Sequence, residues 1–361
     1  MPAQVTGLHH ITAIASEPRQ NLDFYTRILG LRFVKKSVNQ DDPGTYHLYY
    51  GDYAASPGTI LTFFPWAGLP RGRSGTGQAW ATAFSVPAGA LPYWMERLKK
   101  LGVPHQPVER RFTDEALPFT DPDGLRLELV ATREADSRFA APSKDVPAGF
   151  AIRGFHSSTL ALTDSTATAQ ILTASMGYTL TNQAGHRARY SPGTGSPRTY
   201  VDLLTDPALP RGLGGAGTIH HVAFRVADDA QEVTAREILR KSGLTVSPVI
   251  DRAYFKSIYY REPGGVLFEI ATDGPGFAID EPVDQLGTKL GLPPHLEPHR
   301  AGIEAALTHG LSNARVESVN TKLRLLTRIA FGFRSPDALV ALACSTSADS
   351  APRSPAAQPP D

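Results

Sequence analysis

Four short segments of the chain alternate between apolar and polar residues, the period of two that is expected of a β-strand with one buried face. They align position by position and are HHITAIASE (9–17), WATAFSVPA (80–88), HSSTLALTD (156–164) and HHVAFRVAD (220–228). Each is followed by a segment with helical spacing that ends in glycine, the usual C-terminal stop of a helix. The pattern therefore predicts four copies of a strand followed by a helix.

Further strands follow each predicted helix and complete the repeat. The closing strands are GTILTFFPW (58–66), DPDGLRLELV (121–130), RTYVDLLT (198–205) and EPGGVLFEIA (262–271). The sequence thus predicts an α+β fold of four βαβββ modules, near residues 5–66, 77–131, 151–205 and 215–272.

A single module would leave open sheet edges, so we expect the modules to pair. The polar segment 133–150 is typical of a linker. We therefore expect an N-terminal pair of modules at 5–131 and a C-terminal pair at 151–272.

Composition narrows the class of protein. The 361 residues carry a formal net charge of +1, which gives no overall bias toward nucleic acid or a membrane surface. No apolar run approaches the roughly 20 residues of a membrane span, and the N-terminus lacks the features of a signal peptide. The single cysteine, Cys344, excludes an internal disulfide framework and suits a reducing compartment. We expect a cytoplasmic protein with no nucleic-acid partner and no integral membrane segment.

Two of the four aligned strands begin with a pair of histidines. In this alignment the second histidine of each pair, His10 and His221, occupies one common position. Ala81 and Ser157 occupy that position in the second and third modules. A single strand histidine is more often structural, but its recurrence at one position favours a metal site.

A second common position lies in the closing strands. Glu128 and Glu269 each follow a glycine by four residues, and Asp202 is a loose match in the third module. Only the pairing of the first module with the fourth combines two histidines, His10 and His221, with the carboxylate of Glu269. Two imidazoles and a carboxylate form a facial triad, which holds a ferrous ion and leaves positions open.

The donor types restrict the metal further. A site without thiolate argues against structural zinc, whereas Mn²⁺ and catalytic Zn²⁺ accept the same ligands. We interpret Glu128 as an exposed or salt-bridged strand residue, because its module offers no matching histidine. His9 and His220 are expected to face away from the metal, since neighbours in a strand point to opposite faces.

A second group of polar residues precedes Glu269, in DRAYFKSIYYREPGG (251–265). Arginine and tyrosine near a metal could orient or deprotonate a phenolic substrate, although ordinary sheet aromatics and surface arginines would give the same pattern. Alternation allows only one of Tyr259 and Tyr260 to face the metal.

The module plan, together with LHHIT, GTIHHVAF and GGVLFEIATD, resembles the vicinal oxygen chelate superfamily, and within it the hydroquinone-type ring-cleaving dioxygenases. The resemblance spans 5–308 and includes LGTKLGLPPHLEPHR (286–300). It implies two domains whose modules form half-barrels around a metal. It also implies Fe²⁺, with Mn²⁺ as an alternative, bound by His10, His221 and Glu269.

The resemblance further implies an extradiol-like reaction that opens a para-dihydroxylated aromatic ring with O₂, and no organic cofactor. His9, Thr12, Arg252 and Tyr259 match residues that line the family's pocket. A hydroquinone would bind through one phenolate oxygen, with Tyr259, Arg252 and His9 as its partners. In the catechol-cleaving members of the superfamily, all metal ligands lie in one half of the chain. The position of His10 in the first module therefore argues for the hydroquinone group.

Two other functions of this superfamily remain as alternatives, and the oligomeric state is left open. A glyoxalase-type lyase or isomerase would need a further carboxylate ligand, and a binding protein without activity would need no metal.

Residues 273–308 look like a family-specific C-terminal segment, whereas 309–361 do not resemble the family. Within the latter, 321–333 has helical spacing with basic flanks, which is typical of a membrane- or partner-binding helix, a docking helix or a poorly ordered extension. We expect 309–361 to be partly disordered.

Overall fold

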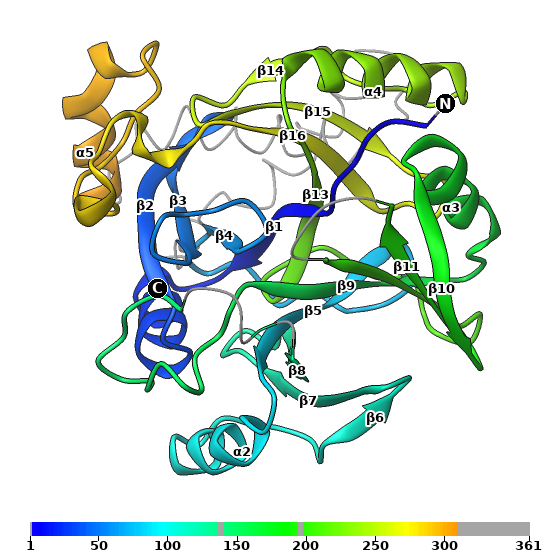
Figure 1. Ribbon diagram of the computed structural model, residues 1–361. Coiled ribbons are helices and arrows are strands. Elements are labelled where there is room, and N and C mark those ends of the chain that lie inside the picture. Colours follow the sequence, from blue (N-terminus) through cyan, green and yellow to red (C-terminus); the bar gives the residue numbers. More distant parts are fainter. Residues whose placement is uncertain (1, 134, 136–139, 194–197, 310–361) are drawn as a thin grey trace, which may run out of the picture. The chain divides into compact units, whose positions relative to one another are not determined.

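The computed structural model describes residues 2–133, 135, 140–193 and 198–309 (Figure 1). The chain divides into two compact units, residues 1–40 with 45–297 and residues 41–44 with 298–361. The described part of the second unit is mainly helical and ends in α5 (Arg300–His309). Among the described residues, no helix has the length and apolar character needed to cross a membrane.

Each module contains the predicted strand, helix and three further strands. The first has β1 (Leu8–Ala15), α1 (Pro18–Asp23), η1 (Phe24–Ile28), β2 (Arg32–Asn39), β3 (Asp42–Gly51) and β4 (Ile60–Pro65). The second has β5 (Gln78–Pro87), α2 (Leu91–Lys100), β6 (Glu109–Arg111), β7 (Asp114–Thr120) and β8 (Arg126–Thr132). The third has β9 (Phe155–Leu162), α3 (Thr166–Gln170), η3 (Ile171–Ser175), β10 (Tyr178–Ala184), β11 (Arg187–Pro192) and β12 (Tyr200–Thr205). The fourth has β13 (Thr218–Val226), α4 (Asp229–Lys241), β14 (Ile250–Asp251), β15 (Phe255–Arg261) and β16 (Leu267–Pro275). Short 3₁₀ turns follow at η4 (Phe277–Ile279), η5 (Val283–Gln285) and η6 (Glu297–His299).

The strands form two curled eight-stranded sheets (Figure 1). One sheet has the order β14-β15-β16-β13-β1-β4-β3-β2, and the other has the order β10-β11-β12-β9-β5-β8-β7-β6. The first module therefore pairs with the fourth and the second with the third, through the antiparallel pairs β1–β13 and β5–β9. Each sheet draws strands from both halves of the chain, and the division into domains at 5–131 and 151–272 stays a prediction.

The helices of the first and third modules differ from the regular helix that the spacing predicts. Both α1 and α3 continue into a π-helical turn. In each, a threonine donates to the carbonyl four residues earlier, Thr26 to Leu22 and Thr173 to Ala169, a contact that competes with the helical backbone bond. The four predicted helix-ending glycines all have positive φ, from 68° to 86°, as a helix C-terminus favours.

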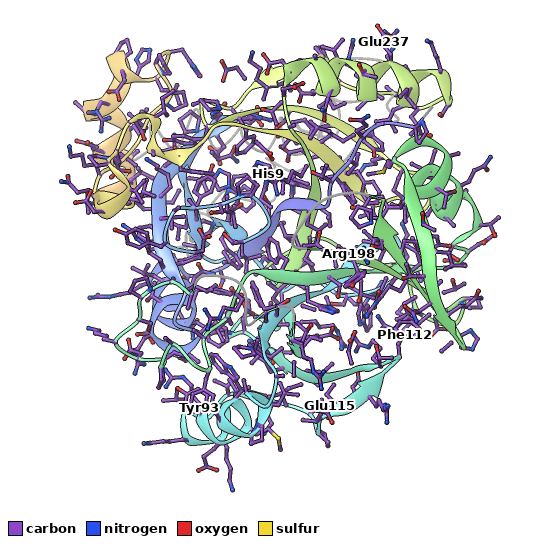
Figure 2. The ribbon with its side chains drawn as sticks, viewed as in Figure 1. His9, Tyr93, Phe112, Glu115, Arg198 and Glu237 are labelled. Carbon is purple, nitrogen blue, oxygen red and sulfur yellow. The ribbon has the colours of Figure 1, made fainter. Side chains whose placement is uncertain are left out.

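Apolar side chains on one face of each sheet pack against the helices and form the main core. The contributions of the longer helices include Trp94 and Leu98 from α2 and Ala235 and Leu239 from α4. Glu237 lies on the exposed face of α4, whereas His9 lies within the protein (Figure 2). Because the helices cover one face of each sheet, the other face is left for polar side chains.

A β-bulge interrupts the alternation at both histidine pairs. In the β1–β13 ladder Leu8 pairs with Phe224 and His10 with Ala223, so His9 is an extra residue on its strand. In the same ladder Thr12 pairs with His221 and Ala13 with Ile219, so His220 is also an extra residue. A bulge redirects the side chain that it contains. Strict alternation therefore does not apply at the two places where the site residues lie.

The second sheet has bulges at the matching positions. In the β5–β9 ladder the register shifts leave Trp80 and His156 as the extra residues. Ala81 and Ser157 then follow the bulges, as His10 and His221 do in the first sheet. The alignment of the four modules by sequence is thus reproduced by the backbone.

Candidate metal centre

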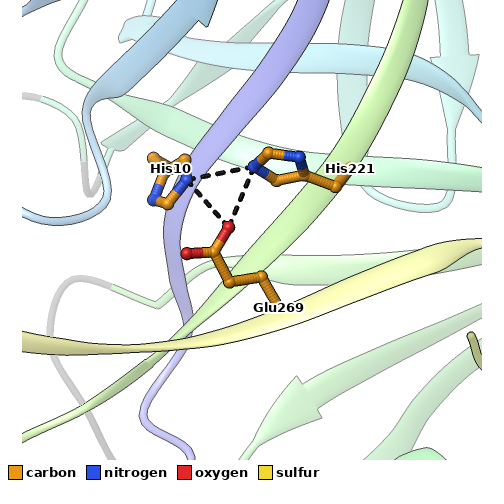
Figure 3. Close-up of side chains that lie close together, drawn as sticks. All are labelled: His10, His221 and Glu269. Atoms are coloured by element: carbon orange, nitrogen blue, oxygen red, sulfur yellow. Dashed lines mark hydrogen bonds and ion pairs between the residues drawn. The ribbon is translucent and has the colours of Figure 1, made fainter. Parts of the chain in front are cut away.

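Three side chains, one from the first module and two from the fourth, meet at one buried point (Figure 3). The Nε2 atoms of His10 and His221 lie 3.3 Å apart, and Oε2 of Glu269 lies 3.2 Å from the first and 2.9 Å from the second. The strands that carry them, β1, β13 and β16, are neighbours in one sheet. Among the described residues, this is the group of histidine and carboxylate side chains placed to hold a metal ion.

The spacing of these atoms fits a facial triad. Two ligands about 2.1 Å from an ion and at right angles to each other lie about 3 Å apart. The three observed distances bracket that value. Oε2 of Glu269 is buried and has no hydrogen-bond partner in the described part of the chain. An unsatisfied carboxylate oxygen facing two imidazole nitrogens is what a cation would satisfy.

His9 and His220 contact the second ring nitrogen, Nδ1, of the histidines beside them. Nδ1 of His9 lies 2.9 Å from Nδ1 of His10, and Nδ1 of His220 lies 2.8 Å from Nδ1 of His221. If Nδ1 of His10 and of His221 donates in these contacts, each Nε2 keeps its lone pair for a metal. The first member of each pair thus contacts the second through the ring nitrogens, because the bulge removes the alternation from which we expected it to face away from the metal.

Burial and charge favour the protonation states of Glu269 and His221 that a metal requires. Burial alone would raise the pKa of Glu269, but the adjacent His10 and His221 outweigh it and hold that pKa well below its usual value. Burial lowers the pKa of His221, and it lowers the pKa of His9 to about 3. Ser257 donates a hydrogen bond to the other oxygen of Glu269, Oε1, and so orients the carboxylate.

Tyr259 and Arg252 lie beside this cluster on the β15 side. Tyr259 pairs with Glu269 across β15 and β16, and its ring centre lies 6.0 Å from that of His221. Nε of Arg252 donates to the Tyr259 hydroxyl at 3.0 Å. Tyr260 points into the core, where its hydroxyl donates to the sulfur of Met176. Tyr259 and Tyr260 thus lie on opposite faces of β15, as alternation predicts, with Tyr259 on the side of His221.

Thr12 and Phe255 complete the immediate surroundings. Thr12 is fully buried and lies opposite His221 in the β1–β13 ladder. The Phe255 ring lies 5.1 Å from that of His9 and 5.0 Å from that of His10. A cavity of about 210 Å³ reaches His9 and is lined in part by Tyr254 and Phe277. That volume exceeds the roughly 150 Å³ of a cavity known to admit benzene.

Sequence reasoning missed His47 and Thr62, which lie on the β4–β3 side of the cluster. Nε2 of His47 lies 2.9 Å from Oγ1 of Thr62, which lies 2.8 Å from Oγ1 of Thr12. His47 has no counterpart in the other modules, so comparison of the repeats gives no signal for it. Only the pairing of β3 and β4 with β1 brings it near the histidines.

The second sheet carries ion pairs where the first carries the metal ligands. Glu128 is buried and makes two contacts with the Arg111 guanidinium, at 2.6 and 2.8 Å. Asp202 is held by Arg189, with Oδ1 2.8 Å from Nε. The interpretation of Glu128 as a salt-bridged residue is confirmed. Each carboxylate at these positions is neutralised by arginine, which leaves no charge for a cation there.

Comparison with family models gives two matches. Residues 7–129 match the Glyoxalase/Bleomycin resistance protein/Dioxygenase superfamily. Residues 293–343 match a Transposase family, and a transposase of insertion sequence element IS1557 from Mycobacterium tuberculosis is 59% identical over 180 residues, 48% of this chain and 39% of that protein. Most of 309–361, including the predicted helix at 321–333, lies outside the described residues.

Two named relatives match this chain over nearly their whole length. MhqO of Bacillus subtilis, named a ring-cleaving dioxygenase, is 45% identical over 310 residues, 85% of this chain and 97% of the relative. The chlorohydroquinone/hydroquinone 1,2-dioxygenase of Sphingobium indicum is 35% identical over 305 residues, 82% of this chain and 94% of the relative.

Solved structures agree with these relatives. A structure from Bacillus subtilis named as a dioxygenase matches with a TM-score of 0.81 and 44% identity, over 84% of this chain and 97% of that one. Glyoxalase I from Zea mays matches with a TM-score of 0.56 at 13% identity, over 74% and 92% of the two chains, and shows the fold alone. On the strength of these relatives, the chain belongs to the ring-cleaving dioxygenases of the Glyoxalase/Bleomycin resistance protein/Dioxygenase superfamily.

Proposed function

We propose that the protein is an Fe²⁺-dependent dioxygenase that opens a hydroquinone-type, para-dihydroxylated aromatic ring with O₂. One observation carries the proposal, namely the convergence of His10, His221 and Glu269 on one buried point with spacings of 2.9–3.3 Å. A facial triad with open positions is the ligand set of non-haem Fe²⁺ oxygenases, and Mn²⁺ accepts the same donors. The bound ion would supply the electron-transfer chemistry that lets dioxygen react with the ring.

The residues around the triad suit a phenolic substrate. Arg252 donates to the Tyr259 oxygen, which leaves the tyrosine O–H free to donate to a substrate oxygen. The guanidinium charge beside it favours the ionised form of a phenol. We therefore assign Tyr259 and Arg252 to binding the ionised hydroxyl, and His9 and His220 to orienting the metal ligands.

A hydroquinone is favoured over a catechol by two observations. The metal ligands come from the first and last modules, and the Sphingobium relative is named for chlorohydroquinone and hydroquinone. A glyoxalase-type lyase would need a further carboxylate, and the described ligand group has three members. We also infer a cytoplasmic location, in keeping with the single cysteine, Cys344.

Dioxygen uptake tests this proposal directly. The purified protein, loaded with Fe²⁺ without air, is mixed with hydroquinone and its substituted forms, and oxygen consumption is followed. We expect uptake of one O₂ per ring opened, and loss of uptake on iron chelation. Absence of uptake across a panel of dihydroxybenzenes would contradict the proposal.

A further inference from the structure

The segment that follows β16 joins the two edges of the sheet that carries the metal ligands. The edge strands of that sheet are β14 and β2. Residues 277–291, here called the strap, lead from the end of β16 to β2 and contain the first part of the family-like segment 286–300 (Figure 1). At β2 the Gly291 amide donates to the Lys36 carbonyl at 2.9 Å, and Leu290 forms a parallel β-bridge with Lys36. The strap thus covers an edge that would otherwise be open.

A buried lysine fastens the strap to β2. Lys35 is fully buried, and its Nζ lies 2.6 Å from Oδ1 of Asp280 and 2.5 Å from Oε2 of Glu281. Oε1 of Glu281 accepts a hydrogen bond from the Lys289 amide at 3.0 Å. The Tyr254 hydroxyl, between β14 and β15, donates to Oδ2 of Asp280 at 3.0 Å. A buried ammonium ion is stable only when it is paired, so Lys35 and the strap hold each other in place.

Two glycines let the strap approach the sheet closely. Gly287 has a φ of 83°, and a side chain there would meet the carbonyl oxygen of Phe33. A side chain at Gly291 would meet the hydroxyl of Tyr254. The strap is therefore fitted to the sheet at both positions.

The cavity of about 210 Å³ runs from the protein surface toward the metal centre. Its lining includes Ala54 and Ala278, which are exposed, and His9, which is buried. His9 contacts the ligand His10 through the two Nδ1 atoms, 2.9 Å apart, and Phe255 packs beside both histidine rings. One layer of side chains thus separates the inner end of the cavity from a metal ligand.

Phe277, the first residue of the strap, forms part of the cavity wall together with Tyr254. The two rings are stacked, with centres 4.8 Å apart and an angle of 18° between their planes. The Phe277 ring also lies 5.3 Å from that of Tyr49. Because Tyr254 binds Asp280 as well, the ion pairs of Lys35 and the aromatic wall are directly connected. A shift of the strap would therefore move Phe277 and change the width of the cavity.

We propose that this cavity is the route by which the aromatic substrate reaches the metal centre, that Phe277 is its specificity-determining residue, and that Lys35 is a positioning residue that holds Phe277 through the strap. The ring faces of Phe277 and Tyr254 suit contact with another aromatic ring. The width that they set favours a small ring over one with a bulky substituent. This inference rests on the proposed function, because it concerns how that site selects its substrate.

Two pairs of variants of the whole chain, loaded with Fe²⁺, test the inference. Phe277→Ala widens the cavity, and Ile279→Ala, at an exposed position of the same 3₁₀ turn, is its control. Lys35→Met removes the ion pairs, and Lys36→Met, whose side chain points to the opposite face of β2 by strand alternation, is its control. For each, kcat/KM for oxygen uptake is measured with hydroquinone and with tert-butylhydroquinone, together with iron content. Hydrogen exchange of the strap amides, followed by mass spectrometry, reports on the fastening of the strap without reference to activity.

We expect Phe277→Ala to raise the ratio of kcat/KM for tert-butylhydroquinone to that for hydroquinone by about 10-fold, since a few methylene groups in a pocket change selectivity by that order. Lys35→Met should raise the same ratio and speed amide exchange in the strap. Both controls should match the parent protein in ratio and exchange, and all four variants should bind iron fully.

An unchanged ratio in Phe277→Ala would overturn the assignment of the route and of Phe277. If Lys35→Met speeds exchange but lowers kcat/KM equally for the two substrates, Lys35 is merely structural and its positioning role is overturned. If Lys35→Met does not fold, the comparison of Phe277→Ala with Ile279→Ala decides. Absence of uptake by the parent protein with either substrate would instead overturn the proposed function.

Discussion

Nε2 of His10 and Nε2 of His221 lie 3.3 Å apart, although the two residues are 211 positions apart in the sequence. The antiparallel pairing of β1 with β13 produces this meeting, and it joins the first module to the last. The same pairing places a bulge at each histidine pair. The site is therefore a property of the seam between two modules, and neither module contains it alone.

We expect loss of a histidine at a bulge to weaken metal binding. His220 offers its Nδ1 to that of His221 at 2.8 Å, so His220→Phe leaves the ligand's second nitrogen without this partner. Loss of such a partner typically weakens metal binding by about 10- to 100-fold. Competition with a calibrated chelator measures the affinity. His156→Phe, at the matching bulge of the second sheet, is the control and should bind iron normally.

We expect substitution of the two adjacent tyrosines to affect turnover differently. Tyr259→Phe removes the hydroxyl that contacts Arg252 and faces the centre, and we expect kcat/KM to fall by about 10- to 100-fold with iron content unchanged. Tyr260→Phe removes only a core contact with the sulfur of Met176 and should keep near-parental turnover. Equal effects of the two substitutions would contradict the assignment of Tyr259 to the substrate.

The periodicity of the sequence was sufficient for the module plan and for the three candidate ligands. His10 and His221 share one position of the repeat, and Glu269 shares another with Glu128, so each could be found by comparing segments along the chain. The bulges at His9 and His220 could not be predicted, because they arise from the register between strands about two hundred residues apart. Alternation within one strand holds no information on that register.

His47 was missed for a related reason. It lies on a strand with no histidine at the equivalent place in the other modules, and its partners Thr62 and Thr12 lie on two other strands. Threonine and tyrosine are ordinary residues of a sheet. Their hydrogen-bonded order appears only when the pairing of the three strands is known.

We expect loss of the ion pair in the second sheet to lower the free energy of unfolding without affecting catalysis. Arg111→Met would leave Glu128 buried without its bidentate partner, and we expect a loss of about 3–5 kcal/mol in the free energy of unfolding. Adding Glu128→Leu should recover much of that loss, since a buried pair can be replaced by apolar groups. Urea unfolding measures both. A large fall in iron content at full folding would contradict the view that this sheet takes no part in metal binding.

We expect Glu232 to make the free energy of unfolding depend on pH. Its side chain is fully buried on α4, and neither oxygen has a hydrogen-bond partner among the described residues. Burial, followed by the charges of Asp229 and Glu269, raises its pKa to about 7. A raised carboxyl pKa means that the folded state binds the proton more tightly than the unfolded state does. The stability that Glu232 contributes therefore falls as pH rises from about 4.5 to 7.

The substitution Glu232→Gln removes this titration. Relative to the parent protein, we expect the variant to gain about 2 kcal/mol in unfolding free energy between pH 5 and pH 8. Glu237→Gln, exposed on the same helix (Figure 2), should show no such change. Parallel pH profiles of the parent and Glu232→Gln would show that the buried carboxyl does not titrate in this range.

Metal content per chain tests the central claim most directly. The protein is prepared without air and loaded with Fe²⁺, unbound metal is removed, and iron is measured for the parent, His221→Ala and His186→Gln. We predict one iron per chain in the parent and in His186→Gln, and almost none in His221→Ala. A parent protein that binds no iron, or a His221→Ala variant that keeps a full equivalent, would contradict the assignment of the site to His10, His221 and Glu269.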